Sequence, residues 1–521
     1  MRRVVVVGML LALVAGCSGD PAPAQAPPPG PVVTTDSGQV RGVATDRYRL
    51  FQGIPYAAPP VGGLRWRSPQ PAEAWAGVRD ATVPGARCAQ RASAGGNAAS
   101  TSEDCLFLNV TAPVAASPAT PRPVLVWLHG GGFVEGAGSD FDARRMAVDG
   151  DVVVVTLNYR LGIFGLLAHD ALTGSGGYAI EDQQAALRWV RRNAQAFGGD
   201  PGNVTLAGES AGGKSVCAQL ASPSAAGLFE RAVLQSAPCA GTVPSGLMFP
   251  GVPAFPQWPS VADREPDGAK VAAELGCADP ATAADCLRAV PVNALLDKHD
   301  RFLSPAHGNP VLPFGPDPAI AEGRVLPVPV LAGFTRDEMS ELAVVSHDLA
   351  GKPLTAQRYT ELLREAFGPA AEQVAAEYPP SRYASPSQAW AAVSTDRVFA
   401  CPAVGYTTRF AARMPTWAYE FAEPGPPVPG MTFPAGAAHA AELPFLFPNF
   451  DTTAPALSSR MIRYWAAFAH TGDPNRPDQP AWPRYGPGAT ALRLAGGGGL
   501  VDLAAEHRCG FWQTVPDQTV P

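Results

Sequence analysis

One serine of this sequence stands in a setting that favours nucleophilic chemistry. The motif G-x-S-x-G occupies residues 208–212 (GESAG), between the apolar run Asn203–Ala207 and a stretch with helical spacing, Ala211–Leu220. In a sharp strand-to-helix turn of this kind the serine hydroxyl is exposed, and the glycines leave room for the crowded backbone. The motif alone often occurs by chance, but these flanks are the ones that the chemistry requires. We therefore predict that Ser210 attacks a carbonyl carbon.

A second, glycine-rich segment favours the stabilisation of negative charge. The sequence HGGGF, residues 129–133, directly follows the apolar run Val124–Leu128. Consecutive glycines let backbone N–H groups approach a substrate oxygen without a Cβ atom in the way, and donors fixed in advance stabilise the oxyanion of acyl transfer. We predict an oxyanion hole formed by the N–H groups of Gly131, Gly132 and Ala211. His129 is expected to hold this loop rather than to act as a base.

These two motifs need a sheet to position them, and the hydrophobic pattern predicts one. Short apolar runs are typical of buried parallel strands, and segments with helical spacing alternate with them. We therefore expect an α/β fold, a single large domain whose mostly parallel central sheet has helices on both faces. The Pro-rich segment from about 240 to 325 is expected to be an insertion around the site. The predicted strands are Val124–Leu128, Val152–Leu157, Asn203–Ala207, Arg231–Gln235, Pro327–Ala332 and Thr416–Phe421, and the predicted helices are Ile180–Phe197, Ala211–Leu220 and Ser458–His470.

Composition excludes several other classes of protein. The chain has 521 residues, of which 46% are hydrophobic, so it can bury a large core. Its formal net charge is −7, only four of its 39 basic residues are lysine, and no basic stripe with interleaved aromatic residues is present. No nucleic-acid partner is therefore expected. The sequence contains no C-x-x-C pair and no histidine cluster with zinc spacing, so we expect neither a metal nor a cofactor.

The N-terminal residues are typical of an export signal. A short basic start precedes the apolar run Val4–Ala15, which is too short for a membrane span of roughly 20 residues but fits a signal peptide. The run ends at VAGC, residues 14–17, which is similar to a bacterial lipobox. We expect residues 1–16 to be a lipoprotein signal peptide, Cys17 to carry lipid, and residues 17–31 to form a Pro/Ala-rich tether to a catalytic domain at 32–521. The alternative is an ordinary signal peptide and a secreted protein.

The remaining cysteines agree with export. Without Cys17 their number is even, which favours disulfide bonds over metal ligation in an exported protein. Cys277 and Cys286 are close enough to close one loop, but spacing does not establish the connectivity. A reduced Cys217, buried as a small hydrophobic residue, is the alternative at that position. The eight cysteines are Cys88, Cys105, Cys217, Cys239, Cys277, Cys286, Cys401 and Cys509.

Further motifs occur in order along the chain and point to one family. They are FQGIPYA at 51–57, PPVG at 59–62, LRW at 64–66, SEDCLFLNV at 102–110, NYR at 158–160 and FGGDP at 197–201. Together with the two glycine motifs they cover the chain from about Val32 to Gln513. With this set the sequence resembles a type-B carboxylesterase, of the carboxylesterase/cholinesterase family of α/β-hydrolases. The resemblance implies the α/β-hydrolase fold, with long loop and helical insertions over the active site.

The resemblance also implies the two partners of the serine. The family's acid lies in a G-x-x-x-D-E context, which is GFTRDE at 333–338, so the acid is Glu338. The family's base precedes an acidic residue and an apolar run, which identifies His439 in the segment HAAELPFLF at 439–447. The chain order Ser210, Glu338, His439 is the order found in α/β-hydrolases. If His439 is the base, activity should rise as it loses a proton, with an apparent pKa of about 6–7.

Roles outside the triad follow from the same resemblance. Glu209 matches a carboxylate of the family's active-site gorge, and a solvated charge beside the turn is the alternative. Phe314, with Pro313, is assigned to the acyl pocket. Arg65 and Glu103 match a buried ion pair of the family.

The resemblance implies the disulfide pairs Cys88–Cys105, Cys277–Cys286 and Cys401–Cys509, which leaves Cys217 and Cys239 as the fourth. The loop between Cys88 and Cys105 contains no aromatic residue. Cholinesterases have a tryptophan there that packs against a quaternary ammonium group, so the sequence argues against choline esters as substrates.

The implied function is hydrolysis of small-molecule carboxylic esters through an acyl-enzyme. An amidase or a lactonase would use the same triad. A non-catalytic, cholinesterase-like binding protein would have lost the serine, the histidine or the oxyanion glycines, all of which are present. No protein partner is predicted, and the only expected membrane contact is the N-terminal lipid.

Overall fold

The computed structural model describes residues 30–93, 96–426, 431–453, 455–486, 488 and 490–517. The predicted signal peptide, the lipidated Cys17 and nearly all of the tether lie outside these residues. Within the described ranges, no helix has the length and the apolar character needed to cross a membrane.

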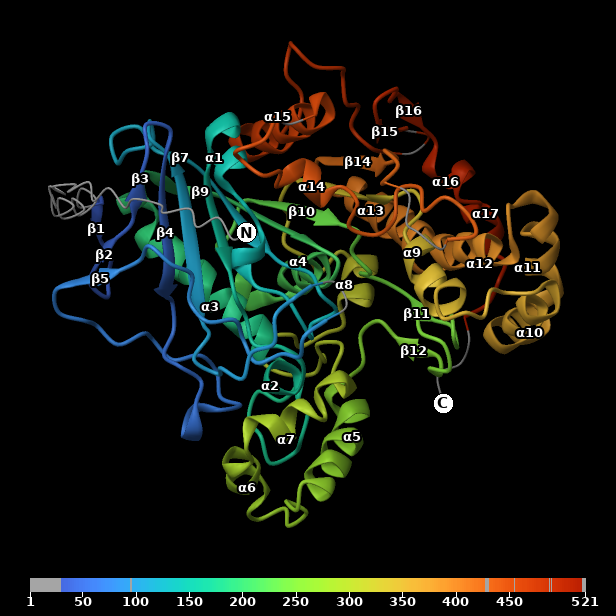
Figure 1. The fold of residues 1–521 in the computed structure, drawn as a ribbon, viewed down its shortest axis with the longest axis horizontal. Helices are drawn as coiled ribbons and strands as arrows, with labels where there is room; N and C mark the ends of the chain where they lie inside the picture. Colours follow the sequence, from blue (N-terminus) through green and yellow to red (C-terminus); the bar gives the residue numbers. More distant parts are fainter. Residues whose placement is uncertain are drawn as a thin grey trace, which may run out of the picture.

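A mostly parallel sheet forms the centre of the molecule (Figure 1). Its described strands are β3 (Val43–Ala44), β4 (Tyr48–Pro55), β6 (Phe107–Pro113), β7 (Arg122–Leu128), β8 (Val153–Leu157), β9 (Gly199–Glu209), β10 (Arg231–Gln235), β13 (Val330–Thr335), β14 (Thr416–Phe421), β15 (Ala491–Leu494) and β16 (Leu500–Val501). Their order is β16-β15-β14-β13-β10-β9-β7-β8-β6-β4-β3. The strands from β15 to β8 pair in parallel, and antiparallel pairs form both edges. A small sheet of β1 (Val32–Thr34), β2 (Gln39–Arg41) and β5 (Val78–Asp80) lies at the β3 edge.

The side chains of β7 alternate between two cores, one on each face of the sheet. Val124, Val126 and Leu128 belong to one core, and Leu125 and Trp127 belong to the other. Burial on both faces explains why such strands are continuous apolar runs. The first face is covered by α2 (Gly162–Leu166), α3 (Tyr178–Asn193), α4 (Ala211–Ala221), α8 (Pro316–Glu322) and α13 (Cys401–Ala411), and the second by α1 (Arg144–Gly150), α14 (Leu443–Leu446) and α15 (Ala456–Thr471).

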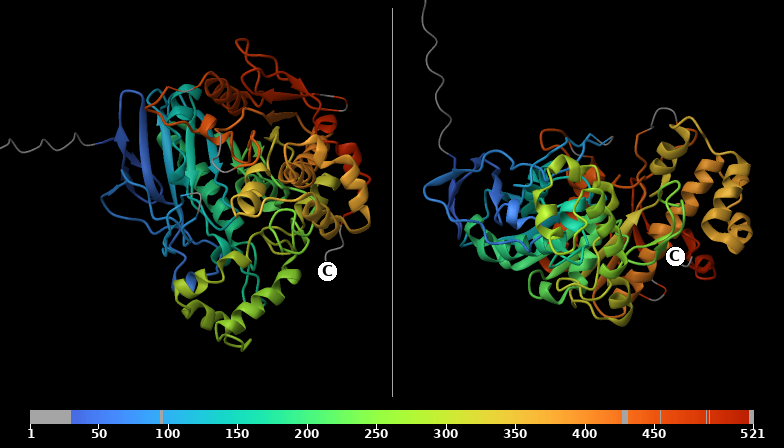
Figure 2. Two further views of the ribbon diagram at one scale, coloured as in Figure 1. Left: turned by 45° about the vertical axis from the view of Figure 1, so that its right-hand side comes forward. Right: turned by 90° about the horizontal axis from the view of Figure 1, so that it is seen from below.

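Two groups of helices extend from this framework, as Figures 1 and 2 show. The first contains α5 (Val261–Glu274), α6 (Ala283–Ala289) and α7 (Val292–Leu296), within the segment that the sequence predicts to be an insertion. The second lies at the end of the molecule opposite β1, β2 and β5, and has its own core around Leu363, Trp390 and Trp512. It consists of α9 (Ser340–Ala343), α10 (Ala356–Phe367), α11 (Ala371–Glu377), α12 (Pro386–Thr395) and α17 (Cys509–Trp512), with α16 (Leu503–Glu506) beside it.

The predicted elements agree with the structure in the centre of the sheet and differ at some ends. Strands β10 and β14 have the predicted bounds. The predicted strand Pro327–Ala332 is wrong at its start, because β13 begins only at Val330; Pro327 and Pro329 have no N–H group to donate to a ladder. The predicted helix ending at Phe197 is α3 followed by a short 3₁₀ turn.

The described residues contain four disulfide bonds: Cys88–Cys105, Cys217–Cys239, Cys277–Cys286 and Cys401–Cys509. These are the pairs named from the family resemblance. The last one joins the first residue of α13 to the first residue of α17, 108 positions later in the chain.

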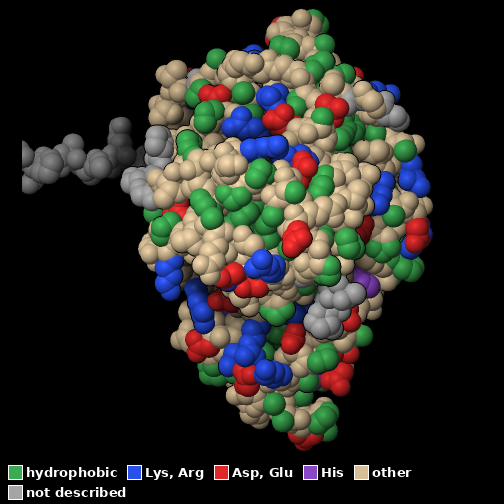
Figure 3. Space-filling model, turned by 90° about the vertical axis from the view of Figure 1, so that its right-hand side faces the viewer, with side chains coloured by type: hydrophobic (Ala, Val, Ile, Leu, Met, Phe, Trp, Pro, Cys, Tyr) green, Lys and Arg blue, Asp and Glu red, His purple; other side chains and the backbone are tan. Residues whose placement is uncertain are grey.

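The surface on the side of α10 and α11 carries charges of both signs (Figure 3). Basic and acidic side chains are interspersed on this face rather than separated into patches. Pairs such as Arg358 with Glu361 on α10 are examples of this arrangement. Because they are solvent-exposed, each contributes only about 0–1 kcal/mol to stability.

Candidate active site

The strand β9 and the helix α4 meet at Ser210 in a strained turn. Ser210 has φ 55° and ψ −120°, a conformation that is costly for a residue with a side chain. Its two flanking glycines make the turn possible. A Cβ atom on Gly208 would lie 2.5 Å from the carbonyl carbon of Gly212, and one on Gly212 would lie 2.0 Å from the carbonyl oxygen of Leu128. Only glycine at both positions lets the turn pack directly against the end of β7.

The structure brings the three predicted triad residues together. Ser210 Oγ lies 2.9 Å from Nε2 of His439, and Nδ1 of the same ring lies 2.5 Å from Oε2 of Glu338. The other carboxylate oxygen of Glu338 accepts a hydrogen bond from the backbone N–H of Thr335 at 2.9 Å. Glu338 is therefore fixed at the end of β13. Because Nδ1–H of His439 donates to Glu338, Nε2 of the same ring is free to accept a proton from Ser210.

The predicted oxyanion hole lies beside this serine. Gly131 and Gly132 have φ values of +93° and +59°, and a Cβ atom on Gly131 would lie 2.3 Å from the carbonyl oxygen of Glu135. In the described part of the chain, none of the N–H groups of Gly131, Gly132 and Ala211 has a backbone acceptor. Ala211 is also the first residue of α4, where the helix dipole favours negative charge. The arrangement suits an oxyanion at this position.

His129 holds the glycine loop, as the sequence predicts. Its Nδ1–H donates to the carbonyl oxygen of Gly130 at 2.8 Å, and its ring stacks on Tyr159, whose hydroxyl donates to the His129 carbonyl at 2.6 Å. Burial lowers the pKa of His129 to about 4, so the ring is neutral. A neutral, fully packed ring confirms a structural role for this residue.

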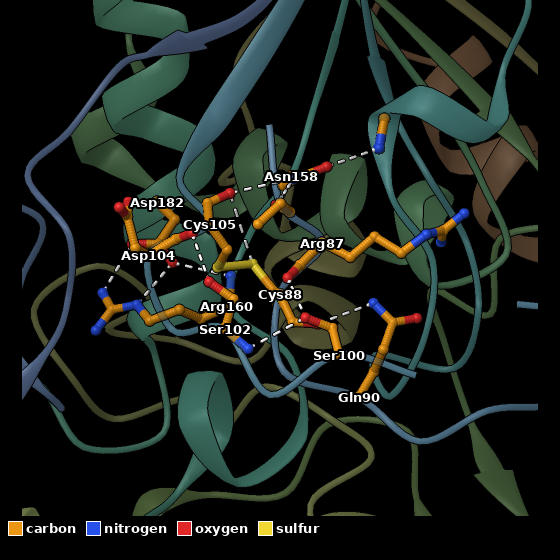
Figure 4. The surroundings of a disulfide bond; sticks show 12 residues. Arg87, Cys88, Gln90, Ser100, Ser102, Asp104, Cys105, Asn158, Arg160 and Asp182 are labelled. Carbon is orange, nitrogen blue, oxygen red and sulfur yellow. Dashed lines mark hydrogen bonds and ion pairs between the residues drawn. A yellow bond between two sulfur atoms is a disulfide. The ribbon is translucent and has the colours of Figure 1, made fainter. Parts of the chain in front are cut away.

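The loop closed by Cys88–Cys105 supports the glycine loop from outside (Figure 4). Gln90 exchanges two hydrogen bonds of 3.0 Å with the backbone of Gly136. Asn158 donates to the carbonyl oxygen of Cys105 at 3.1 Å and accepts from the N–H of Gly138 at 2.9 Å. The backbone that follows the glycine loop is thus tied to this segment at two points, directly through Gln90 and through Asn158.

Glu209 is buried beside the triad and is not the solvated charge of the alternative interpretation. Only 3% of the residue is exposed, and its Oε1 lies 3.2 Å from Nε2 of His439. Burial raises the pKa of Glu209 to about 8, against the lowering effect of His439. The titrations of Glu209 and His439 are linked, because the two side chains are in direct contact.

The pKa of His439 is raised by its carboxylate neighbours. Burial opposes the charged imidazolium, but the negative charges of Glu209 and Glu338 outweigh it and raise the pKa to about 10. This is higher than the range of about 6–7 that an unperturbed histidine leads us to expect. The physical reason is that the imidazolium lies between two buried carboxylates rather than in water.

Two neighbours of His439 received no role in the sequence analysis. Glu442 is fully buried, accepts a hydrogen bond from Gln235 at 3.1 Å and has a pKa raised to about 7, chiefly by burial. The ring of Phe399 lies 5.2 Å from that of His439. Glu442 is the acidic residue of the histidine motif, so the sequence could have indicated its place near His439. Phe399 comes from the π-helical turn Asp396–Ala400, which no sequence motif indicates.

Among the described residues, the structure provides no contact between Phe314 and the triad. Its side chain precedes α8, is 50% exposed, and packs under the guanidinium group of Arg324 at 4.2 Å. The assignment of Phe314 to the acyl pocket is therefore not carried further.

Comparison with known proteins decides the family. Residues 29–512 match the sequence model of the carboxylesterase family. The chain belongs to this family. It is a carboxylic ester hydrolase with the α/β-hydrolase fold.

The relatives cover nearly the whole chain of this carboxylesterase. The para-nitrobenzyl esterase of Bacillus subtilis (strain 168) is 38% identical over 474 residues, which make up 87% of this chain and 92% of that protein. The cocaine esterase of Homo sapiens is 31% identical, with 99% and 96% covered. A solved structure of a PNB esterase superposes with a TM-score of 0.75 at 35% identity and covers 92% of this chain and 99% of that one.

The electrostatics of this site predict the pH dependence of a Glu209→Gln variant. In the wild type, kcat/KM for a neutral ester should rise with pH, with a midpoint above 6.5, because His439 is active when neutral and its pKa is raised. Removing the Glu209 charge lowers the pKa of His439, so the midpoint should move to lower pH. Profiles of kcat/KM against pH for both proteins measure the shift. An unmoved midpoint would show that Glu209 does not act on the base.

Proposed function

We propose that this carboxylesterase hydrolyses its substrates through an acyl-enzyme formed on Ser210. The observation that carries the proposal is the continuous chain of short contacts from Ser210 Oγ to His439 and from His439 to the buried Glu338. A serine hydroxyl is a weak nucleophile, and a neutral imidazole within hydrogen-bond distance is the group that activates it.

The reaction would proceed in two halves. In the first, Ser210 Oγ attacks the ester carbonyl while Nε2 of His439 takes its proton, and the oxyanion lies against the N–H groups of Gly131, Gly132 and Ala211. The imidazolium then protonates the leaving alcohol as the tetrahedral intermediate collapses to the acyl-enzyme. In the second half, His439 removes a proton from water as the water attacks the acyl carbonyl. The imidazolium then returns this proton to Ser210 Oγ as the bond between Oγ and the acyl carbon breaks, which releases the acid and restores the free enzyme. Glu338 holds the ring and stabilises its positive charge in both halves.

We also propose that the enzyme is exported and held on the extracytoplasmic face of the membrane by lipid on Cys17. The lipobox-like end of the N-terminal apolar run supports this proposal, and four disulfide bonds are compatible with an oxidising compartment. A Pro/Ala-rich tether after the anchor would keep the catalytic domain clear of the lipid surface.

Substitution of the nucleophile tests the catalytic proposal. Ser210→Ala should lower kcat for a p-nitrophenyl acyl series by roughly 10⁴-fold or more, because no other group replaces the serine. The matched control is Ser224→Ala, at an exposed serine beyond the end of α4, which should retain wild-type rates. Equal activity of Ser210→Ala and wild type would exclude Ser210 as the nucleophile, and amide turnover exceeding ester turnover would favour an amidase.

Substitution of the lipobox cysteine tests the anchoring proposal. In a bacterial host that processes lipoproteins, Cys17→Ala should move ester hydrolysis from the membrane fraction to the soluble exported fraction, because the acceptor of the lipid is lost. Activity per molecule should not change. If the wild-type chain is itself found in the soluble exported fraction, the signal peptide is an ordinary one.

A further inference from the structure

One lysine is buried in the nucleophile's own helix. Lys214 lies on α4, and its backbone N–H donates to the carbonyl oxygen of Ser210 at 2.8 Å. Only 5% of the residue is exposed. Its ammonium donates to Oε1 of Gln257 at 3.2 Å and lies 4.9 Å from the ring centre of Trp258. An ammonium has three N–H donors, so two of them have no hydrogen-bond acceptor within the described structure.

The other buried cationic side chains among the described residues have carboxylate partners. Arg65 pairs with Glu103 at 2.5 Å, and Arg160 pairs with Asp182 at 2.7 Å. Lys214 has no carboxylate partner in the described chain, and burial lowers its pKa to about 7 with no negative charge to offset it. Burying an unpaired charge is costly. The buried Lys214 ammonium near Ser210 therefore needs a compensating interaction. A negative charge on the substrate would supply this missing partner.

Lys214 lies one helical turn after Ser210 on α4. Residues four apart lie on one face of a helix, with Cβ atoms roughly 5–6 Å apart, and side chains lean toward the helix N-terminus. The long Lys214 side chain therefore leans toward the turn that carries Ser210.

Gln257 and Trp258, the two residues that contact the Lys214 ammonium, are held in place by hydrogen bonds. Gln257 donates its backbone N–H to the carbonyl oxygen of Gly241 and accepts from the hydroxyl of Ser304. The indole N–H of Trp258 donates to Cys239, which is disulfide-bonded to Cys217 on α4. The ammonium thus lies against two well-held residues of the 240–325 insertion.

We propose that Lys214 is a specificity-determining residue that binds a carboxylate in the acyl part of the substrate, so that monoesters of dicarboxylic acids are preferred over neutral esters of matched length. The proposal rests on acyl transfer to Ser210. A bound carboxylate supplies the partner that Lys214 lacks and accepts its free N–H donors in a charge-assisted hydrogen bond.

The acyl side is assigned from the position of the base. The leaving alcohol must receive a proton from Nε2 of His439, so it departs on the His439 side of Ser210. The side chains that contact His439 are Ser210, Glu209, Glu338 and Phe399, whereas those that contact Lys214 are Gln257 and Trp258. Within the described structure the two groups share no side chain, and on this basis we place Lys214 on the acyl side.

The experiment compares charged and neutral acyl chains in one set of proteins. The probes are the monoethyl esters of succinic, glutaric and adipic acids and, as neutral counterparts, ethyl butanoate, pentanoate and hexanoate. The ratio of kcat/KM for the charged to the neutral ester of equal length is measured for wild type, Lys214→Met and Lys214→Arg. For the best-fitting length, Lys214→Met should lower this ratio by about 10- to 100-fold, the effect of losing a hydrogen bond to a charged group. Lys214→Arg should retain most of it.

Controls separate this proposal from the proposed function and from a structural role. Lys270→Met removes an exposed lysine of α5 and should leave the ratio unchanged. If Lys214→Met leaves the ratio unchanged while hydrolysis still depends on Ser210, the proposal is wrong; if it only lowers the melting temperature, Lys214 serves the fold. A further probe, the butanoyl ester of glycolic acid, carries its carboxylate in the alcohol part; if Lys214→Met slows only its hydrolysis, the acyl assignment is wrong. Failure of every ester to show Ser210-dependent hydrolysis would contradict the proposed function itself.

Discussion

The close packing of the turn at Ser210 against the end of β7 is the constraint on which the rest of the site depends. Because Gly212 lies directly on the carbonyl oxygen of Leu128, the strand β9, the helix α4 and the glycine loop after β7 are forced to meet at one point. Ser210 then lies beside the glycine loop, since a Cβ atom on Gly130 would lie 3.1 Å from Cβ of Ser210. The energy stored in the unusual backbone of Ser210 is supplied by the large core on both faces of the sheet.

Buried charge divides this site into two parts. Around His439, the carboxylates of Glu209, Glu338 and Glu442 lie close enough to affect its pKa, so the base is held among negative charges. Around Lys214, one turn along α4, a single ammonium has no negative partner among the described residues. The carboxylates raise the pKa of His439, whereas the role that we propose for Lys214 is to attract an anionic substrate. Protein interiors rarely retain such charges without use.

Much of the fold and of the catalytic geometry could be predicted from the sequence because local pattern determines them. Continuous apolar runs identify strands that are buried on both faces, and the glycines around Ser210 report a close approach that no other residue allows. The predicted strand Pro327–Ala332 was wrong at its start, because Pro327 and Pro329 cannot donate to a ladder. Phe314 stays a prediction, since the position of a side chain relative to the substrate depends on the tertiary arrangement. The burial of Lys214 could not be predicted from the sequence, because a lysine in a helix is ordinarily solvated. Its burial becomes visible only when the insertion packs over α4.

Covalent labelling of the nucleophile tests the central claim most directly. Diethyl p-nitrophenyl phosphate should transfer one diethylphosphoryl group to Ser210 Oγ with release of p-nitrophenolate, and ester hydrolysis should be lost in proportion to the label. Intact mass and peptide mapping measure the stoichiometry and the site. We expect one label per chain, on the peptide that contains Ser210, and none in the Ser210→Ala protein. Stoichiometric inactivation with the label on another residue would contradict the account.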